Sequence, residues 1–112
     1  MDVDYKKLAI KVGYSYLNGG YRRWEDGAGK IHSYESMDDD YLKNCINFVD
    51  RGIEELKNDK NGITNIIKKH LSKMIDDPSE KDIKRAKKQI TEILKAKKKE
   101  LKEYKKEKKN KK

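Results

Sequence analysis

The sequence predicts a mainly α protein of the α+β class, with a small head of amphipathic helices and a β-hairpin followed by a long, projecting basic helix. Apolar residues recur at helical spacing over residues 38–58, 63–75 and 79–110. A glycine-rich turn separates two β-favouring runs within residues 21–35. Only 34% of the 112 residues are hydrophobic and 44% are charged, which limits the chain to one small core.

The segment 4–18 is compatible with two structures. Tyr5, Leu8 and Val12 recur at the spacing of one helix face. Over the same segment, however, apolar residues also alternate with small or polar ones, as they do in a strand. The Asn-Gly-Gly sequence at residues 18–20 suits a helix C-cap and equally a hairpin turn. We prefer the helix and keep the strand as the alternative.

A β-hairpin is expected over residues 21–35. Tyr21–Trp24 and Lys30–Tyr34 are short runs of β-favouring residues. The Asp-Gly-Ala-Gly sequence between them, at residues 26–29, supplies residues that tolerate the positive φ of a tight turn. The two runs are therefore predicted to pair as neighbouring antiparallel strands.

Two amphipathic helices should follow the hairpin. Three acidic residues at 38–40 favour a helix start, because they can cap its amide groups and complement its dipole. The apolar stripe of the helix over residues 38–58 is Leu42, Cys45, Ile46, Val49, Ile53 and Leu56. The apolar stripe of the helix over residues 63–75 is Ile63, Ile66, Ile67, Leu71, Met74 and Ile75. Pro78 then separates this helix from the next.

One long helix is predicted over residues 79–110. Ser79 and Asp82 resemble a capping box at its start. Its apolar stripe is Ile83, Ala86, Ile90, Ile93, Leu94, Leu101 and Tyr104. A helix of that length spans about 48 Å, so we expect its end to project from a globular head formed by residues 1–77. The basic helix of residues 78–112 is thus a separate unit in this prediction, and its apolar stripe suggests a possible homodimer.

The positive charge belongs to the second half of the chain. Residues 1–60 contain 10 Lys and Arg against 12 Asp and Glu, a balance of −2, whereas residues 61–112 contain 19 against 8, a balance of +11. Ten of these lysines lie in residues 97–112. Lysine is a hydrated point charge without the planar fork with which arginine grips phosphate or guanine. The charge therefore suits diffuse attraction to an acidic surface better than sequence-specific binding of DNA.

No pattern in the sequence indicates catalysis. His70 and Cys45 fall on predicted apolar faces, where a structural histidine and a small buried thiol explain them. There is no metal-ligand spacing, nucleophile motif or phosphate-binding loop. Helix capping explains the acidic residues 38–40 better than a cation site does. We predict no catalytic residue, no metal site, no cofactor and no enzymatic activity.

Two segments are candidates for a partner-binding surface. The first joins aromatic residues to arginines at 21–24, a combination that can stack on bases and hold phosphate, although packing against a small core is the favoured explanation. The second is the lysine-rich end of the chain. The residues that we expect at such a surface are Tyr21, Arg22, Arg23, Trp24, Lys97, Lys98, Lys99, Lys102, Lys105 and Lys106.

Residues 24–46 resemble a pattern found in small phage and prophage proteins of mostly unassigned function. In that pattern a Trp and a Gly-centred hairpin lead to Ile, Met and acidic residues, and His-Leu-x-Asn-x-Ile then opens a helix. Here the corresponding residues are Trp24, Gly27, Ile31, Met37, Asp38, Asp39, Asp40, Tyr41, Leu42, Asn44 and Ile46, with Tyr41 in place of the usual His. The resemblance covers about a fifth of the chain and implies a mobile-element origin, a setting in which small proteins often block host defence.

Two functions are therefore predicted. The first is an anti-CRISPR-like inhibitor that contacts a host protein or ribonucleoprotein complex. The alternative is a nonspecific nucleic-acid-binding accessory protein that uses its lysine-rich helix. The chain has no signal-peptide pattern at its start and no apolar run that would cross a bilayer, and its single cysteine excludes an internal disulfide. We expect no membrane contact and a location in the cytoplasm of the host cell.

Overall fold

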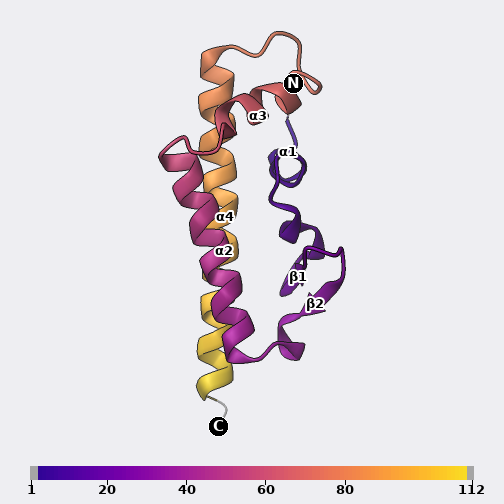
Figure 1. Ribbon diagram of the computed structural model, residues 1–112, viewed down its shortest axis with the longest axis vertical. Helices are drawn as coiled ribbons and strands as arrows, with labels where there is room; N and C mark the ends of the chain where they lie inside the picture. Colours follow the sequence, from indigo (N-terminus) through magenta and orange to yellow (C-terminus); the bar gives the residue numbers. More distant parts are fainter. Residues whose placement is uncertain (1–2, 111–112) are drawn as a thin grey trace.

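The computed structural model describes residues 3–110 and confirms a mainly α fold with one hairpin and a long C-terminal helix (Figure 1). The α-helices are α1 (Tyr5–Lys11), α2 (Asp39–Lys57), α3 (Ile63–Leu71) and α4 (Glu80–Asn110). The strands are β1 (Arg23–Glu25) and β2 (Ile31–Ser33), and the 3-10 helices are η1 (Ser15–Gly19) and η2 (Tyr34–Ser36). Lys111 and Lys112, the last two lysines of the basic stretch, lie outside the described residues.

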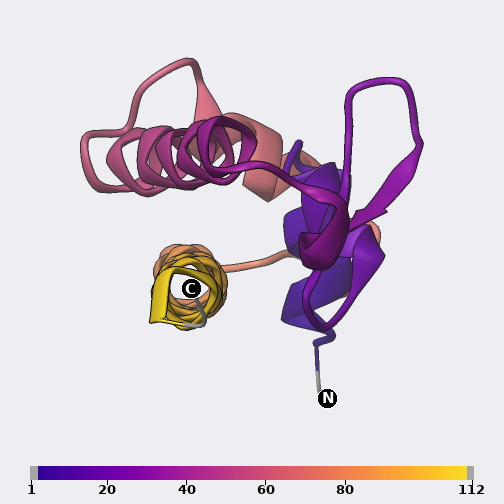
Figure 2. The same cartoon turned by 90° about the horizontal axis from the view of Figure 1, so that it is seen from below.

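Helices α2 and α4 determine the shape of the molecule. They run antiparallel along its long axis, and α1 and the hairpin lie beside them (Figure 1). Seen along that axis, α2, α4 and the N-terminal segment stand at the corners of a triangle (Figure 2). The principal extents are 53 × 25 × 24 Å. The core lies inside this triangle, with α3 crossing one end.

The N-terminal segment is helical, as preferred, but in two pieces. Asp4 caps α1, because its side chain accepts a hydrogen bond of 3.0 Å from the N–H of Lys7. Leu8 is fully buried on the inner side of α1. Gly13, at a φ of +131°, then turns the chain, so the second half of the segment forms the separate helix η1.

The turn of the hairpin is organised by one carboxylate. Asp26 Oδ1 accepts hydrogen bonds of 2.9 Å from the N–H groups of both Ala28 and Lys30. Its Oδ2 lies 2.8 Å from Nε2 of His32. These contacts, that of His32 foremost, hold the pKa of Asp26 below its usual range. The hairpin prediction is confirmed, with a turn that its own side chain stabilises.

The hairpin is attached to the core through Trp24. Its ring stacks in parallel on Tyr16 of η1 at a centroid distance of 4.3 Å. A Cβ atom on Gly19 would lie 2.8 Å from the backbone nitrogen of Trp24, so only glycine allows η1 and β1 to approach this closely. Arg22 has a φ of +54°, which a strand does not allow. Tyr21 and Arg22 therefore form a turn, and β1 begins at Arg23.

α2 presents two different sides. Asp38 caps the helix by accepting a hydrogen bond of 2.8 Å from the N–H of Tyr41, which confirms the predicted role of the acidic run. The buried side of α2 consists of Leu42, Cys45, Val49, Gly52 and Leu56. Ile46 and Ile53, which the sequence placed on the same stripe, are only half-buried and face a neighbouring groove.

α4 begins at the predicted capping box. Asp82 accepts a hydrogen bond of 2.9 Å from the N–H of Ser79, and Ser79 Oγ accepts one of 3.1 Å from the N–H of Asp82. The buried residues of α4 are Ala86, Ile90, Leu94, Lys97 and Leu101. They recur every three or four residues over more than four turns, so α4 contributes to the core along most of its length.

The structure corrects one expectation for this helix and bears on two others. Its end does not project, because the head is elongated enough to cover it: Leu101 is fully buried, and Lys108 donates a hydrogen bond to the carbonyl of Met37. Within residues 3–110, the predicted head and α4 share one hydrophobic cluster, so α4 is part of the same core. The apolar stripe from which a homodimer was predicted packs against the chain's own core, and the homodimer itself stays a prediction.

Candidate functional site

The inner side of α4 carries a buried ammonium group. The side chain of Lys97 is only 6% exposed. Its Nζ donates hydrogen bonds to the carbonyl oxygens of Gly20 at 3.0 Å and Arg23 at 2.6 Å, and to Oε1 of Glu100 at 3.1 Å. All three ammonium protons thus have acceptors, which is what a buried charge requires. Lys97 therefore anchors the loop between η1 and β1 to α4.

Glu100 completes this arrangement from the other side. Its Oε1 also accepts hydrogen bonds of 2.7 Å from the hydroxyl of Tyr34 and 2.9 Å from the N–H of Arg22. Burial lowers the pKa of Lys97, while the neighbouring Glu100 carboxylate opposes that shift. Burial and the bond to Glu100 raise the pKa of Tyr34, so its hydroxyl stays a donor. We call Lys97, Glu100, Tyr34 and Arg22 the Lys97 network.

The arginine of this network also secures the far end of α4. Arg22 Nη2 lies 2.9 Å from Oε1 of Glu107, and the guanidinium group stands 5.3 Å from the ring centroid of Tyr104. The hydrogen bond that Arg22 donates to the Glu107 carboxylate raises the pKa of Arg22. Both contacts hold the guanidinium group of Arg22 against its own chain, so this group is not free to bind a phosphate.

A groove between α2 and α4 lies on the outside of the molecule, and we call it the α2–α4 groove. From α2 it is lined by Lys43, Ile46, Asp50, Ile53, Glu54 and Lys57. From α4 it is lined by Thr91, Lys95, Lys98, Lys99, Lys102, Glu103, Lys105, Lys106 and Lys109. Nine lysines face three acidic residues, an excess of six positive charges in a chain whose net charge is +9.

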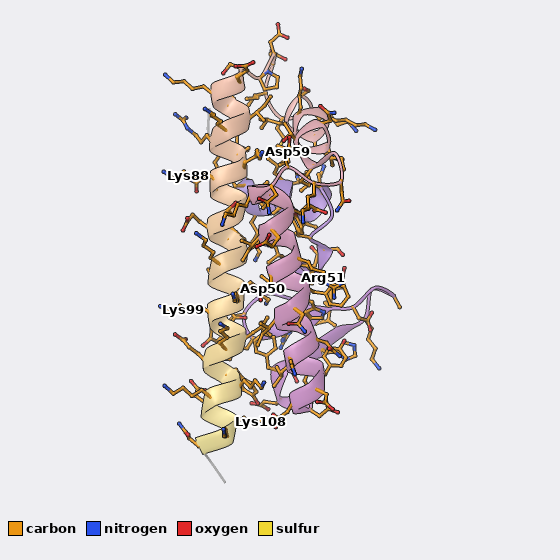
Figure 3. The ribbon with its side chains drawn as sticks, turned by 60° about the vertical axis from the view of Figure 1, so that its left-hand side comes forward. Asp50, Arg51, Asp59, Lys88, Lys99 and Lys108 are labelled. Atoms are coloured by element: carbon orange, nitrogen blue, oxygen red, sulfur yellow. The ribbon has the colours of Figure 1, made fainter. Side chains whose placement is uncertain are left out.

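The groove has two sections that meet at Lys102. The wide section, of about 910 Å³, contains all three acidic residues. Figure 3 shows Asp50 between the two helices, where it pairs with Lys98 at 2.5 Å, whereas Arg51 points away from α4. The basic section, of about 390 Å³, is lined by five lysines and Ile46 and has no acidic residue.

The groove lysines are largely free to meet a partner. Within residues 3–110, only Lys98 and Lys99 of the nine form a salt bridge, and that of Lys99 with Glu103 is long, at 3.9 Å. Between the lysine rims lie the half-buried side chains of Ile46, Ile53 and Thr91. The groove can therefore bind a group that is both acidic and partly apolar.

The predicted partner-binding residues fall into two sets. Lys98, Lys99, Lys102, Lys105 and Lys106 all line the α2–α4 groove. Trp24 and Lys97 are buried and inaccessible to a partner, and Arg22 is engaged by Glu107. Arg23 and Tyr21, the latter 75% exposed, are accessible but are not in the groove. Burial of Trp24 agrees with the packing role that was the favoured explanation.

Sequence reasoning missed the contribution of α2 to this surface. Ile46, Asp50, Ile53 and Lys57 recur at intervals of four, three and four residues, which is a second helix face beside the buried one. Lys43 extends that face into the basic section. The spacing carries this signal, but both isoleucines also fit the core stripe, so the sequence alone does not separate the two faces.

Burial changes the pKa values of both the Cys45 thiol and the His70 imidazole. Burial raises the pKa of the Cys45 thiol to about 12, which keeps it protonated. Burial, with the positive charge of nearby lysines, lowers the pKa of His70. Within residues 3–110 no group of three His, Cys, Asp or Glu side chains is placed to hold a metal ion. None of the helices in that range has the length and hydropathy needed to cross a bilayer.

No family model matches the sequence, and no curated protein or solved structure matches the chain. The α2–α4 groove is thus described from its own residues alone.

Proposed function

We propose that this chain is a non-enzymatic binding protein that attaches to an acidic surface of a partner protein through the α2–α4 groove. The observation that carries the proposal is the combination of lysine rims with the half-buried isoleucines between them. Unpaired lysines attract an acidic partner, and apolar area buried between them adds affinity that charge alone does not supply.

The acidic residues of the groove favour a protein partner over a nucleic acid. Asp50, Glu54 and Glu103 line the wide section, where they would repel a phosphate backbone. A protein partner can place lysine or a hydrogen-bond donor against each of them. The wide section also lacks an exposed aromatic ring or arginine on which bases could stack.

The biological setting of this proposal comes from the resemblance to phage and prophage proteins. In that setting the partner is a component of a host defence complex, such as a CRISPR effector, and occupation of its acidic surface blocks a subunit or nucleic-acid site. The positive charge of the groove is consistent with such a partner only where that partner is acidic or already carries nucleic acid.

Nonspecific nucleic-acid binding is the second candidate, and the basic section favours it. Lys43, Lys102, Lys105, Lys106 and Lys109 lie together there without an acidic residue. Such a cluster neutralises phosphates and releases their counterions, so binding would weaken steeply as salt increases.

A pull-down from a host lysate, with and without nuclease, tests the proposal. The first variant is Lys102→Glu/Lys105→Glu, which reverses two groove lysines. The matched control is Lys84→Glu/Lys88→Glu, which makes the same charge change at exposed α4 positions outside the groove (Figure 3 labels Lys88). We expect a protein partner that survives nuclease, is retained by the control and is lost from the groove variant. Recovery of nucleic acid alone, or equal loss from both variants, contradicts the proposal.

A further inference from the structure

We infer that the α2–α4 groove receives an acidic amphipathic helix of the partner, which completes a three-helix arrangement with α2 and α4. This inference rests on the proposed function and specifies what occupies the groove. It follows from the shape of the groove, the apolar side chains between its rims and the distribution of charge along it.

The shape of the groove suits a helix. Its walls are two antiparallel helices, and along α4 it extends from Thr91 to Lys109, about 27 Å at 1.5 Å per residue. A helix of about 18 residues matches that length. An extended segment would leave its backbone groups unpaired in the groove, because the backbone of α2 and α4 is already hydrogen-bonded within each helix. A helix satisfies its own backbone and presents only side chains.

The side chains between the rims provide the apolar contacts. Ile46 and Ile53 are seven residues apart, which places them two turns apart on the same side of α2. Both are half-buried, so a partner can remove their remaining surface from water. An incoming helix with apolar residues at positions i, i+3, i+4 and i+7 would cover both.

The charge along the groove determines the orientation of the occupant, because one section of the groove is more basic than the other. The wide section contains acidic residues that partly balance its lysines, whereas the basic section contains lysines and no acid. Charge complementarity therefore places the more acidic end of the occupant against Lys102, Lys105 and Lys109. A nucleic acid has a uniform charge and no apolar face, so it matches neither this gradient nor the isoleucines.

Three probes distinguish these occupants by fluorescence anisotropy. The first is a labelled helical peptide of about 18 residues with leucines on one face and glutamates on its flanks, more glutamate being at one end. The second is a peptide of the same composition in shuffled order, and the third is a single-stranded DNA of equal length. We expect the amphipathic peptide to bind at least about tenfold more tightly than either other probe.

Variants then locate the binding. Ile46→Gln/Ile53→Gln should weaken peptide binding roughly tenfold, whereas Ile31→Gln, an exposed position on the hairpin, should not. If the isoleucine variant folds poorly, as judged by circular dichroism, a charge exchange replaces it. Lys102→Glu/Lys105→Glu should not bind the glutamate peptide. It should bind a peptide in which lysines replace the glutamates of the more acidic end.

The outcomes separate this inference from the proposed function. Equal binding of the shuffled peptide or DNA, or no binding of the amphipathic peptide, overturns the inference. If a nuclease-resistant partner is nevertheless captured and lost from Lys102→Glu/Lys105→Glu, the proposed function stands without it. If capture does not depend on those lysines, both fail.

Discussion

Lys97 and Lys102 lie on the same helix, less than two turns apart, and have opposite roles. Lys97 is buried and hydrogen-bonded to two backbone carbonyls and Glu100. Lys102 is exposed where the two sections of the α2–α4 groove meet. The first charge stabilises the attachment of a loop, while the second is available to a partner. Clusters of lysine in a sequence therefore do not identify a binding surface until the buried ones have been separated from the exposed ones.

The largest loss of stability is expected from a charge placed in the hydrophobic core. Val49 is fully buried between α2 and its neighbours, and Val49→Asp buries a carboxylate without a partner. That change costs several kcal/mol, comparable with the stability of a small domain, so the variant should be unfolded by circular dichroism. Asn47→Asp, which adds the same charge at an exposed position of α2, should melt as the parent does. A folded Val49→Asp variant would contradict the described packing of α2.

Removal of each of the two lysines tests the comparison directly. Lys97→Ala removes three hydrogen bonds of a buried ammonium group and leaves the part-buried Glu100 carboxylate without its ion-pair partner, so the free energy of unfolding should fall by about 3 kcal/mol. Lys102→Ala should change it by less than about 0.5 kcal/mol. Urea unfolding of both variants measures the difference. Similar values for the two lysines would show that Lys97 is not buried as described.

The reactivity of the Cys45 thiol tests the burial of the inner side of α2 in the unmodified protein. Because burial raises its pKa to about 12, the thiol should be protonated and unreactive towards a thiol reagent at pH 8. In urea its pKa returns towards 9, and the ionised fraction and the reaction rate should both increase. Fast modification of the native protein would show that α2 and α4 separate readily.

The smallest expected effect is at the start of α4, where an exposed side chain acts locally. Hydrogen bonds from Ser79 lower the pKa of Asp82 from its ordinary value of 3.8. A carboxyl with a lowered folded pKa stabilises the fold above about pH 4, and that contribution is lost as the pH falls through the folded pKa. NMR titration should find the pKa below 3.8 in the parent and closer to it in Ser79→Ala. An unchanged pKa in that variant would show that the Ser79 hydroxyl does not contribute to the shift, which would then rest on the backbone N–H of residue 79.

Local patterns in the sequence were enough to predict the elements. The spacing of apolar residues, the acidic cap at Asp38, the turn at Asp26 and the capping box at Ser79 and Asp82 each act within a few residues of the chain. The predicted helices and hairpin therefore agree with the structure to within a few residues at most ends. Only at residues 4–18 did two local patterns compete, and burial of Leu8 against the rest of the core favoured the helix.

The sequence by itself determined a mainly α fold, the approximate bounds of its hairpin and three longer helices, and a basic second half. Only the tertiary structure decided which lysines are buried, that α4 packs along the head, and that α2 forms the second wall of the groove. The reason is that helical spacing defines faces but not what covers them. The two carbonyl acceptors of Lys97 lie 77 and 74 residues away in the chain, and no local pattern can indicate such a partner.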